Sequence, residues 1–238
     1  MKESSYAYSA QPSRNPFRVL LALWRSVRDI SNTDEVAIVE IAFARSRSAR
    51  RFARWDQVIA RLDADERTAA MVGETRRFGP IDLESLSKLP EGTLGRVFAD
   101  HCRSRGLDPN LVRVPGDESV DRLLDRLYGT HDVWHVATGW GNDENGEVGL
   151  GAFYLAQLEA PFFAFLFAII LLNTVFMAPA TLRPRIDALV AGYRAGNDAE
   201  PLFAVDWDTL WATPLSDVRR QLGLANAVIV GERIGDAA

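Results

Sequence analysis

The run from Ala160 to Leu182 contains no charged side chain, and as a helix it is long enough to cross the hydrocarbon core of a bilayer. Two features argue against a simple span: Pro161 and Pro179 lie near its ends, and Asn173 and Thr174 lie inside it. Three arrangements stay open, namely a buried helix that lines an apolar ligand cavity, a helix inserted shallowly into a membrane, and a transmembrane helix. We favour the first.

Apolar residues elsewhere recur mainly at spacings of three and four, which is the period of a helix face. After Ser119, for example, Val120, Leu124, Leu127 and His131 lie close to one stripe. The sequence contains no sustained alternation of apolar and polar residues bounded by hairpin turns, which strands would require. We therefore predict an all-α fold.

The chain divides into three predicted parts. Residues 1–15 are polar and are predicted to form a flexible N-terminal tail, residues 16–224 a single helical domain, and residues 225–238 a C-terminal tail. A basic stretch runs from Arg45 to Arg54. We interpret it as a solvated helix face, and the alternative is electrostatic contact with anionic lipid headgroups.

Composition narrows the class of protein. The net charge of -5 and the pI near 5.3 do not favour nucleic-acid binding, which needs a basic surface. The single cysteine, Cys102, excludes an intramolecular disulfide and is expected to be a small core residue in a reducing compartment. Arg18 interrupts the first apolar stretch, so we expect no secretory signal and a cytoplasmic location.

Two of the three histidines are predicted to share one helix face with an acidic neighbour. Because an α-helix advances about 100° per residue, His135 lies about 40° round from His131, and Asp132 about 100° round. Glu147 can close the site from the next helix once the polar loop from Gly139 to Gly146 turns the chain back. Imidazole and carboxylate groups bind Zn²⁺ and related ions. We predict a divalent metal held by these four residues, with positions left for water or substrate.

Other interpretations of these residues remain open. A histidine on an apolar face is more often a core residue than a ligand, although two unpaired imidazoles there would carry a desolvation cost. Asp132 is either a ligand or a group that fixes an imidazole tautomer. An HD-type phosphohydrolase would instead use His101 with the His131–Asp132 doublet, leaving His135 and Glu147 incidental.

Three separated blocks of the sequence resemble the coenzyme Q biosynthesis protein 4 family. The first is Leu89 to Gly95, which reads LPEGTLG, and the second is His131-Asp132-x-x-His135 followed after eleven residues by Glu147. The third comprises Trp211, Pro214-Leu215, Val218-Arg219 and Leu222-Gly223-Leu224. Their order and spacing agree from Phe17 to Leu224, which is nearly the whole chain.

This resemblance implies an all-α homodimer with a divalent metal, usually taken to be zinc, and a bound isoprenoid lipid; we keep Co²⁺, Fe²⁺ and Mn²⁺ as alternatives. It also implies action on a polyprenyl hydroxybenzoate, the precursor of the ubiquinone head group. The family is viewed either as the enzyme that removes the C1 carboxylate, with hydroxylation at that carbon, or as a scaffold for other quinone-biosynthesis enzymes. We expect peripheral association with the inner face of the membrane, from which the lipid tail would be drawn.

Our first hypothesis is a metal-dependent decarboxylase, and the second is a non-catalytic lipid-binding organiser. In the first, the catalytic residues are His131, Asp132, His135 and Glu147, and the expected substrate- and lipid-binding residues are Phe153, Tyr154, Gln157, Phe163 and Phe167. The sequence departs from the family pattern in its polar loop, residues 141–145, and at Tyr154, where the family would have glutamate. We therefore expect the surroundings of the metal to differ from those in the family.

Overall fold

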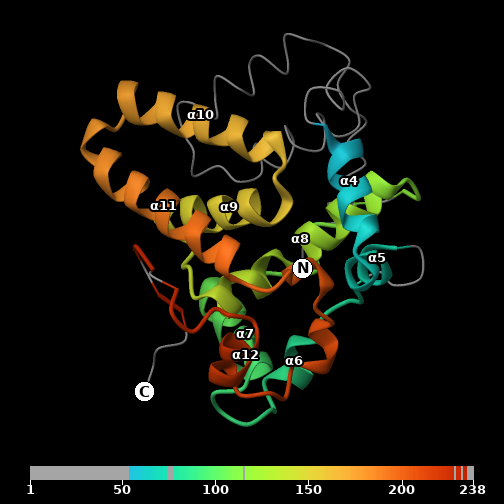
Figure 1. Ribbon diagram of the computed structural model, residues 1–238. Coiled ribbons are helices and arrows are strands. Elements are labelled where there is room, and N and C mark those ends of the chain that lie inside the picture. The colour runs from blue at the N-terminus through green and yellow to red at the C-terminus, as the bar shows by residue number, and fades with distance from the viewer. Residues whose placement is uncertain (1–53, 74–77, 115, 228, 232, 235–238) are drawn as a thin grey trace, which may run out of the picture.

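The computed structural model describes residues 54–234 except 74–77, 115, 228 and 232 (Figure 1). The predicted N-terminal tail and all but Arg54 of the basic stretch lie outside these residues. The elements are α4 (Trp55–Ala64), α5 (Glu66–Val72), α6 (Leu83–Leu86), α7 (Leu94–Arg105), α8 (Ser119–Thr138), α9 (Glu144–Leu158), α10 (Pro161–Phe176), η1 (Pro179–Thr181), α11 (Leu182–Asp198), η2 (Leu202–Ala204), η3 (Trp207–Thr209) and α12 (Leu215–Gln221).

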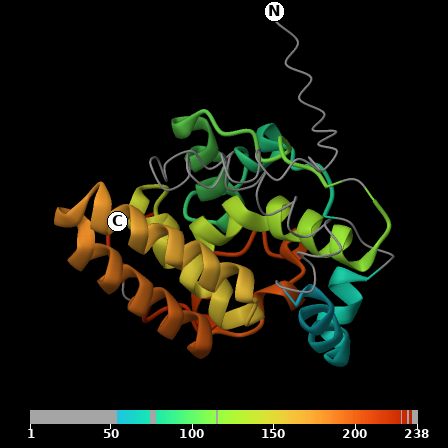
Figure 2. The same ribbon diagram turned by 90° about the horizontal axis from the view of Figure 1, so that it is seen from above.

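The described part of the chain is all-helical, as predicted, and two isolated β-bridges are its only strand-like pairs. Helix α8 is central, since it contacts α4, α5, α7, α9 and α12. Helices α9, α10 and α11 lie together at one side of the molecule, and α4 and α5 lie at the other (Figures 1 and 2). Fifteen residues of α8 are buried, so this helix is a rigid base for the side chains that it carries.

Helices α9 and α11 approach one another at glycines. A Cβ atom added to Gly192 would lie 1.9 Å from the carbonyl oxygen of Gly149, and one added to Gly196 would lie 2.7 Å from that of Phe153. No side chain fits between the backbones at these points. The two helices therefore pack backbone to backbone, which fixes α9 and the residues at its N-terminus.

The uncharged run is divided between α10, a turn and the start of α11. Helix α10 ends at Phe176, and Pro179 opens the short helix η1, because proline supplies no N–H to continue the preceding helix. Inside the run, Asn173 and Thr174 accept hydrogen bonds of 2.8 and 2.7 Å from the buried guanidinium of Arg185 on α11. Within the described ranges, no helix has the length and apolar character to cross a membrane.

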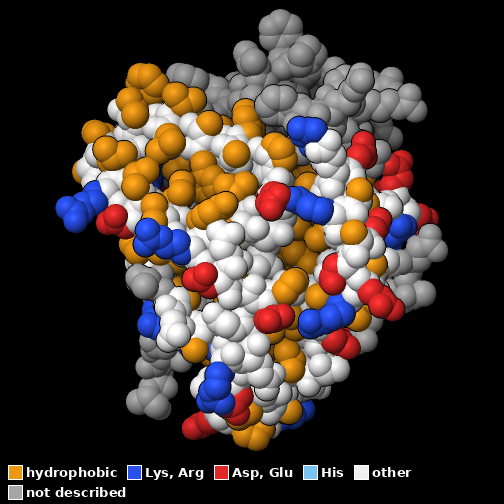
Figure 3. All heavy atoms as spheres, viewed as in Figure 1, with side chains coloured by type: hydrophobic (Ala, Val, Ile, Leu, Met, Phe, Trp, Pro, Cys, Tyr) orange, Lys and Arg blue, Asp and Glu red, His pale blue; other side chains and the backbone are white. Residues whose placement is uncertain are grey.

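One face of α10 is buried, and the other is exposed together with part of α11. The exposed large apolar side chains of this region are Leu171, Leu172, Val175, Phe176, Met177, Leu182, Ile186, Val190 and Tyr193. They form much of the apolar surface at the upper left of Figure 3. We call this set the α10–α11 apolar face.

The segment that follows α12 packs against the end of α8. Arg219 donates hydrogen bonds to the carbonyl groups of Val136 and Ala137 in the last turn of α8, and to that of Ile234. Ile234 is buried and donates its N–H to the carbonyl of Gly139 at 3.0 Å. The C-terminal residues, which the sequence analysis assigned to a tail, thus hold the turn between α8 and α9.

Candidate metal centre

Three ligand-type side chains converge between α8 and α9. The Nε2 atoms of His131 and His135 lie 3.2 Å apart. The Glu147 carboxylate lies 3.3 Å from His135 Nε2 through Oε1 and 3.8 Å from His131 Nε2 through Oε2. In the described residues this is the one group of histidine, cysteine or acidic side chains whose ligand atoms all come within 4.8 Å of one another. The fold thus brings together three of the four residues proposed from the sequence.

Local structure explains this convergence. The two histidines are one turn apart on α8, whose C-terminal cap, Gly139, has the left-handed φ of 91° that ends a helix. Asp143 then caps α9 by accepting the N–H of Gly146 at 2.8 Å. Helix α9 therefore begins at Glu144, three residues earlier than the position near Glu147 expected from the sequence, and Glu147 lies in its first turn.

His135 is oriented by a backbone carbonyl. Its Nδ1 lies 3.0 Å from the oxygen of Trp140, and because a carbonyl only accepts, Nδ1 must carry the proton. In the neutral ring, Nε2 then presents its lone pair to the centre. A carbonyl on the outer nitrogen is the arrangement that fixes metal-binding histidines. This contact has no signature in the sequence, since Trp140 supplies its backbone carbonyl rather than its side chain.

The centre is closed on one side and open on the other. The His135 side chain is 0% exposed, whereas those of His131 and Glu147 are each 32% exposed. His135 therefore forms the floor of the site. A small molecule would reach the centre past His131 and Glu147.

The three groups perturb one another electrostatically. Burial opposes the charged form of Glu147, but the charge of His135, its hydrogen bond and the charge of His131 outweigh that effect and lower the Glu147 pKa to about 2. Burial acts to lower the pKa of His135, but the Glu147 carboxylate reverses this and raises it. The pKa of His131 is lowered by burial and by the neighbouring His135. The site thus holds a permanent carboxylate beside two imidazoles.

The donor set and its spacing fit a first-row divalent ion. Around a tetrahedral zinc with bonds of about 2.0–2.1 Å, ligand atoms stand roughly 3.3 Å from one another. The separations of 3.2, 3.3 and 3.8 Å in this group are close to that value. Two imidazoles and one carboxylate leave a coordination position for water or substrate, as in catalytic zinc sites.

Asp132 and His101 lie outside this group. Asp132 is half-buried, and its negative charge acts on both His131 and His135; its role as a ligand stays a prediction. His101 is buried, and its pKa is lowered by burial and by the charge of His135. An HD-type phosphohydrolase needs His101 among the ligands, so this geometry does not favour that alternative.

The five side chains expected to bind the lipid tail lie on α9 and α10, and four of them are aromatic. Phe153, Tyr154, Phe163 and Phe167 are all buried in the core. The Gln157 amide donates to the carbonyl of Gly196 at 2.7 Å and accepts from the N–H of Leu202 at 2.9 Å, so its polar atoms tie α9 to the following chain. Their lipid contact stays a prediction.

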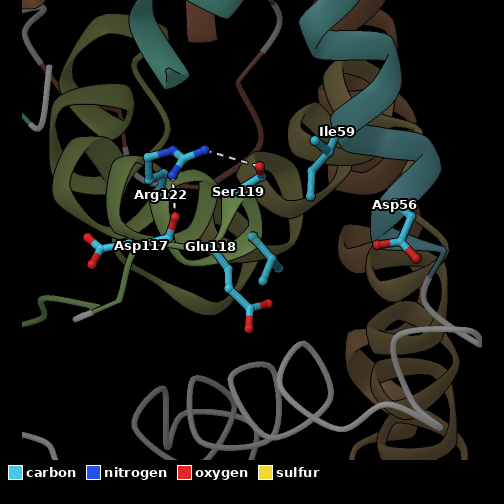
Figure 4. Close-up of a pocket in the computed structure, with 7 residues that line it drawn as sticks. Asp56, Ile59, Asp117, Glu118, Ser119 and Arg122 are labelled. Atoms are coloured by element: carbon cyan, nitrogen blue, oxygen red, sulfur yellow. Dashed lines mark hydrogen bonds between the residues drawn. The ribbon is translucent and has the colours of Figure 1, made fainter. Parts of the chain in front are cut away.

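One hollow in the described part of the chain lies away from the candidate centre. It has a volume of about 500 Å³ and lies between α4 and the start of α8 (Figure 4). It is lined by Asp56, Ile59, Asp117, Glu118, Ser119, Val120 and Arg122. None of the metal-centre or predicted tail residues lies on it, and its acidic lining does not suit an isoprenoid chain.

Comparison with known proteins shows the family of this chain. The sequence pattern of the family described as "Coenzyme Q (ubiquinone) biosynthesis protein Coq4" matches residues 17–227. The chain belongs to this family. The match includes α8 and α9, which carry the candidate metal centre, and extends slightly beyond the range expected from the sequence blocks.

Individual curated relatives share about a quarter of their aligned residues with this chain. The mitochondrial ubiquinone biosynthesis protein COQ4 of Meyerozyma guilliermondii is 25% identical over 153 residues, which is 60% of this chain and 46% of that protein. That of Pyricularia oryzae is 28% identical over 153 residues, which is 60% of this chain and 48% of that protein. The chain thus spans about half the length of the curated relatives it matches.

A solved structure shares the fold. A crystal structure from Nostoc punctiforme, assigned to ubiquinone biosynthesis, superposes with a TM-score of 0.73 at 29% identity. The match covers 88% of this chain and 98% of the other. The chain therefore shares the fold of that protein.

Proposed function

We propose that this chain acts in ubiquinone-type quinone biosynthesis as a metal-dependent decarboxylase of a polyprenyl hydroxybenzoate. The observation that supports the proposal most directly is the convergence of His131, His135 and Glu147 on one partly open centre. Membership of the Coq4 family supports the pathway. The proposed substrate class is the one that the family's place in ubiquinone biosynthesis suggests.

Each residue has a defined task in this proposal. His131, His135 and Glu147 hold the cation, and His135 keeps its Nε2 directed inward through its contact with Trp140. A bound divalent ion supplies Lewis acidity, which stabilises the negative charge left on the ring as carbon dioxide departs. The bond between C1 and the carboxylate breaks, its electron pair stays on C1, and a proton from solvent replaces the carboxylate. Asp132, half-buried beside the two imidazoles, either orients one of them or ligates the cation.

The lipid tail would arrive from a membrane at the α10–α11 apolar face. Val175, Phe176 and Met177 are 64%, 72% and 52% exposed, and Arg183 follows with its side chain 92% exposed. An exposed apolar tip followed by a basic residue suits shallow insertion among anionic headgroups. Burial of a polyprenyl tail against the aromatic rings of α9 and α10 would contribute about 0.8 kcal/mol per methylene.

The test is turnover with a carboxyl-labelled substrate. Purified chain loaded with Zn²⁺, Co²⁺, Fe²⁺ or Mn²⁺ is incubated with prenylated 4-hydroxybenzoate carrying ¹³C in its carboxyl group, with and without oxygen. Labelled carbon dioxide is expected with the wild type and not with the Glu147→Gln variant. The ring product also shows whether C1 carries hydrogen or, with oxygen present, hydroxyl.

A non-catalytic organiser is the alternative. It would bind prenylated intermediates and present them to partner enzymes, and the metal would then be structural. Release of no label with any of the four metals, together with lipid that co-purifies in stoichiometric amount, would establish the organiser and overturn the decarboxylase.

A further inference from the structure

The two histidines of the metal centre are arranged in the same way. Each directs Nε2 to the centre, and each has an oxygen atom of the protein beside Nδ1. For His135 this oxygen is the Trp140 carbonyl at 3.0 Å, and for His131 it is the Tyr154 hydroxyl at 3.4 Å. The similarity points to a positioning role for the hydroxyl.

Packing fixes the position of that hydroxyl. Tyr154 is 2% exposed, and its ring stacks on Trp134 with centroids 4.4 Å apart and planes 13° apart. On α10, Phe163 lies parallel to the same ring at 5.5 Å and 7°. A tyrosine held between two aromatic rings has little rotational freedom, so its oxygen is as well placed as a backbone carbonyl.

His131 needs such a partner more than His135 does. Its side chain is 32% exposed, whereas that of His135 is fully buried. A partly exposed imidazole exchanges tautomers and rotates unless one nitrogen is anchored. The His131 ring lies nearly parallel to Tyr154, at 6.0 Å and 11°, which places the hydroxyl beside its Nδ1.

We propose that Tyr154 is a positioning residue of the metal centre, whose hydroxyl accepts the Nδ1–H of His131 and thereby holds the lone pair of His131 Nε2 toward the cation. The inference rests on the proposed metal site. Helix α10 then contributes to the site indirectly, because its Phe163 stacks on the ring of Tyr154. Tyr154 does not touch the reacting atoms in this role.

The experiment compares Tyr154→Phe, which keeps the stacked ring and removes only the oxygen, with the matched control Tyr193→Phe, whose ring is exposed on α11. Each is titrated with Co²⁺, whose visible absorption reports the ligand set. The proposal expects Co²⁺ affinity of Tyr154→Phe to fall about 10- to 100-fold, as when the outer partner of a ligand histidine is lost. It also expects altered Co²⁺ bands, with the control unchanged. Affinity and bands equal to those of the wild type would overturn it.

A second measurement does not depend on any variant. Nitrogen-15 NMR of wild-type protein, with the histidines assigned, reports which ring nitrogen carries the proton in the metal-free and Zn²⁺-loaded forms. A proton on Nδ1 of His131 in the metal-free form supports the proposal, and a proton on Nε2 in that form overturns it. Neither readout measures turnover, so a failure of decarboxylation alone would not affect this result. A wild-type protein that binds no metal would overturn the proposed function. The tautomer of His131 in the metal-free protein would still decide the role of Tyr154.

Discussion

His135 and Glu147 lie on different helices, and yet the imidazole Nε2 and the carboxylate Oε1 are 3.3 Å apart. The imidazole is wholly buried, while the carboxylate is one-third exposed. A buried imidazole alone would carry a desolvation cost, and the carboxylate offsets it by favouring the protonated ring. His135 therefore closes the buried side of the centre, and Glu147 lies on its solvent-exposed side.

Replacement of His135 should abolish stoichiometric metal binding. In His135→Ala the floor ligand and its Trp140 anchor are both lost, so we expect metal content to fall from about one ion per chain to near zero, with catalysis lost alongside. Inductively coupled plasma mass spectrometry of dialysed protein measures the metal content per chain. His101→Gln is the matched control, since that histidine is also buried but lies outside the group. Full occupancy in His135→Ala, or loss in His101→Gln, would refute the ligand assignment.

The helix period alone was enough to pair His131 with His135, because residues one turn apart share a face whatever surrounds the helix. The position of Glu147 depends in addition on where α9 begins, and the Asp143 cap sets that start. That cap is visible in the sequence as an aspartate three residues before Gly146. The loop between α8 and α9 is therefore shorter than the predicted range from Gly139 to Gly146.

The groups that orient the histidines could not be predicted. Trp140 contributes a backbone carbonyl, which has no signature in the sequence. Tyr154 reaches His131 only because α9 folds back along α8. The uncharged run was ambiguous for a related reason: composition does not show where a helix ends, and Arg185, which satisfies Asn173 and Thr174, comes from another helix.

Metal binding should release a proton and strengthen as the pH rises. The raised pKa of His135 means that its Nε2 keeps a proton to higher pH in the metal-free protein than a free histidine would, and a cation must displace that proton. Glu147, with a pKa of about 2, stays ionised throughout. Calorimetric titration with Zn²⁺ between pH 5.5 and 8.5, in buffers of different ionisation enthalpy, should show affinity that climbs and then levels off. A binding enthalpy independent of the buffer would contradict this account.

Gly192 should tolerate no larger residue. In Gly192→Ala the new Cβ would lie 1.9 Å from the Gly149 carbonyl oxygen, so α9 and α11 must separate. We expect a loss of about 1–3 kcal/mol in the free energy of unfolding, as for other overpacked contacts. Gly151→Ala is the control, because its Cβ would meet only the Phe167 ring at 3.6 Å. Urea unfolding followed by circular dichroism compares them, and equal midpoints would show that the helices are not in backbone contact.

Cys102 should be inert in the folded protein. Burial raises the pKa of its thiol to about 12, and the charges of Asp132 and Asp108 act in the same direction. At pH 8 the reactive thiolate is then on the order of a thousandfold rarer than in an unfolded chain, where the pKa is near 8.5. Reaction with a disulfide reagent should be slow in buffer and fast in guanidinium chloride. Rapid labelling of the native protein would mean that α7 opens readily.

The α10–α11 apolar face should carry any membrane contact. Phe176 and Leu172 are 72% and 47% exposed, and burial of the exposed parts of these two side chains in a bilayer would contribute roughly 2–4 kcal/mol. The double variant Leu172→Glu/Phe176→Glu should therefore bind liposomes that contain anionic lipid more than tenfold more weakly than the wild type in flotation assays. Leu111→Glu is the matched control, since Leu111 is 51% exposed but lies between α7 and α8, away from this face. Unchanged flotation of the double variant would exclude this face as the membrane contact, and a shift from dimer to monomer in sedimentation would show that it joins two copies of the chain instead.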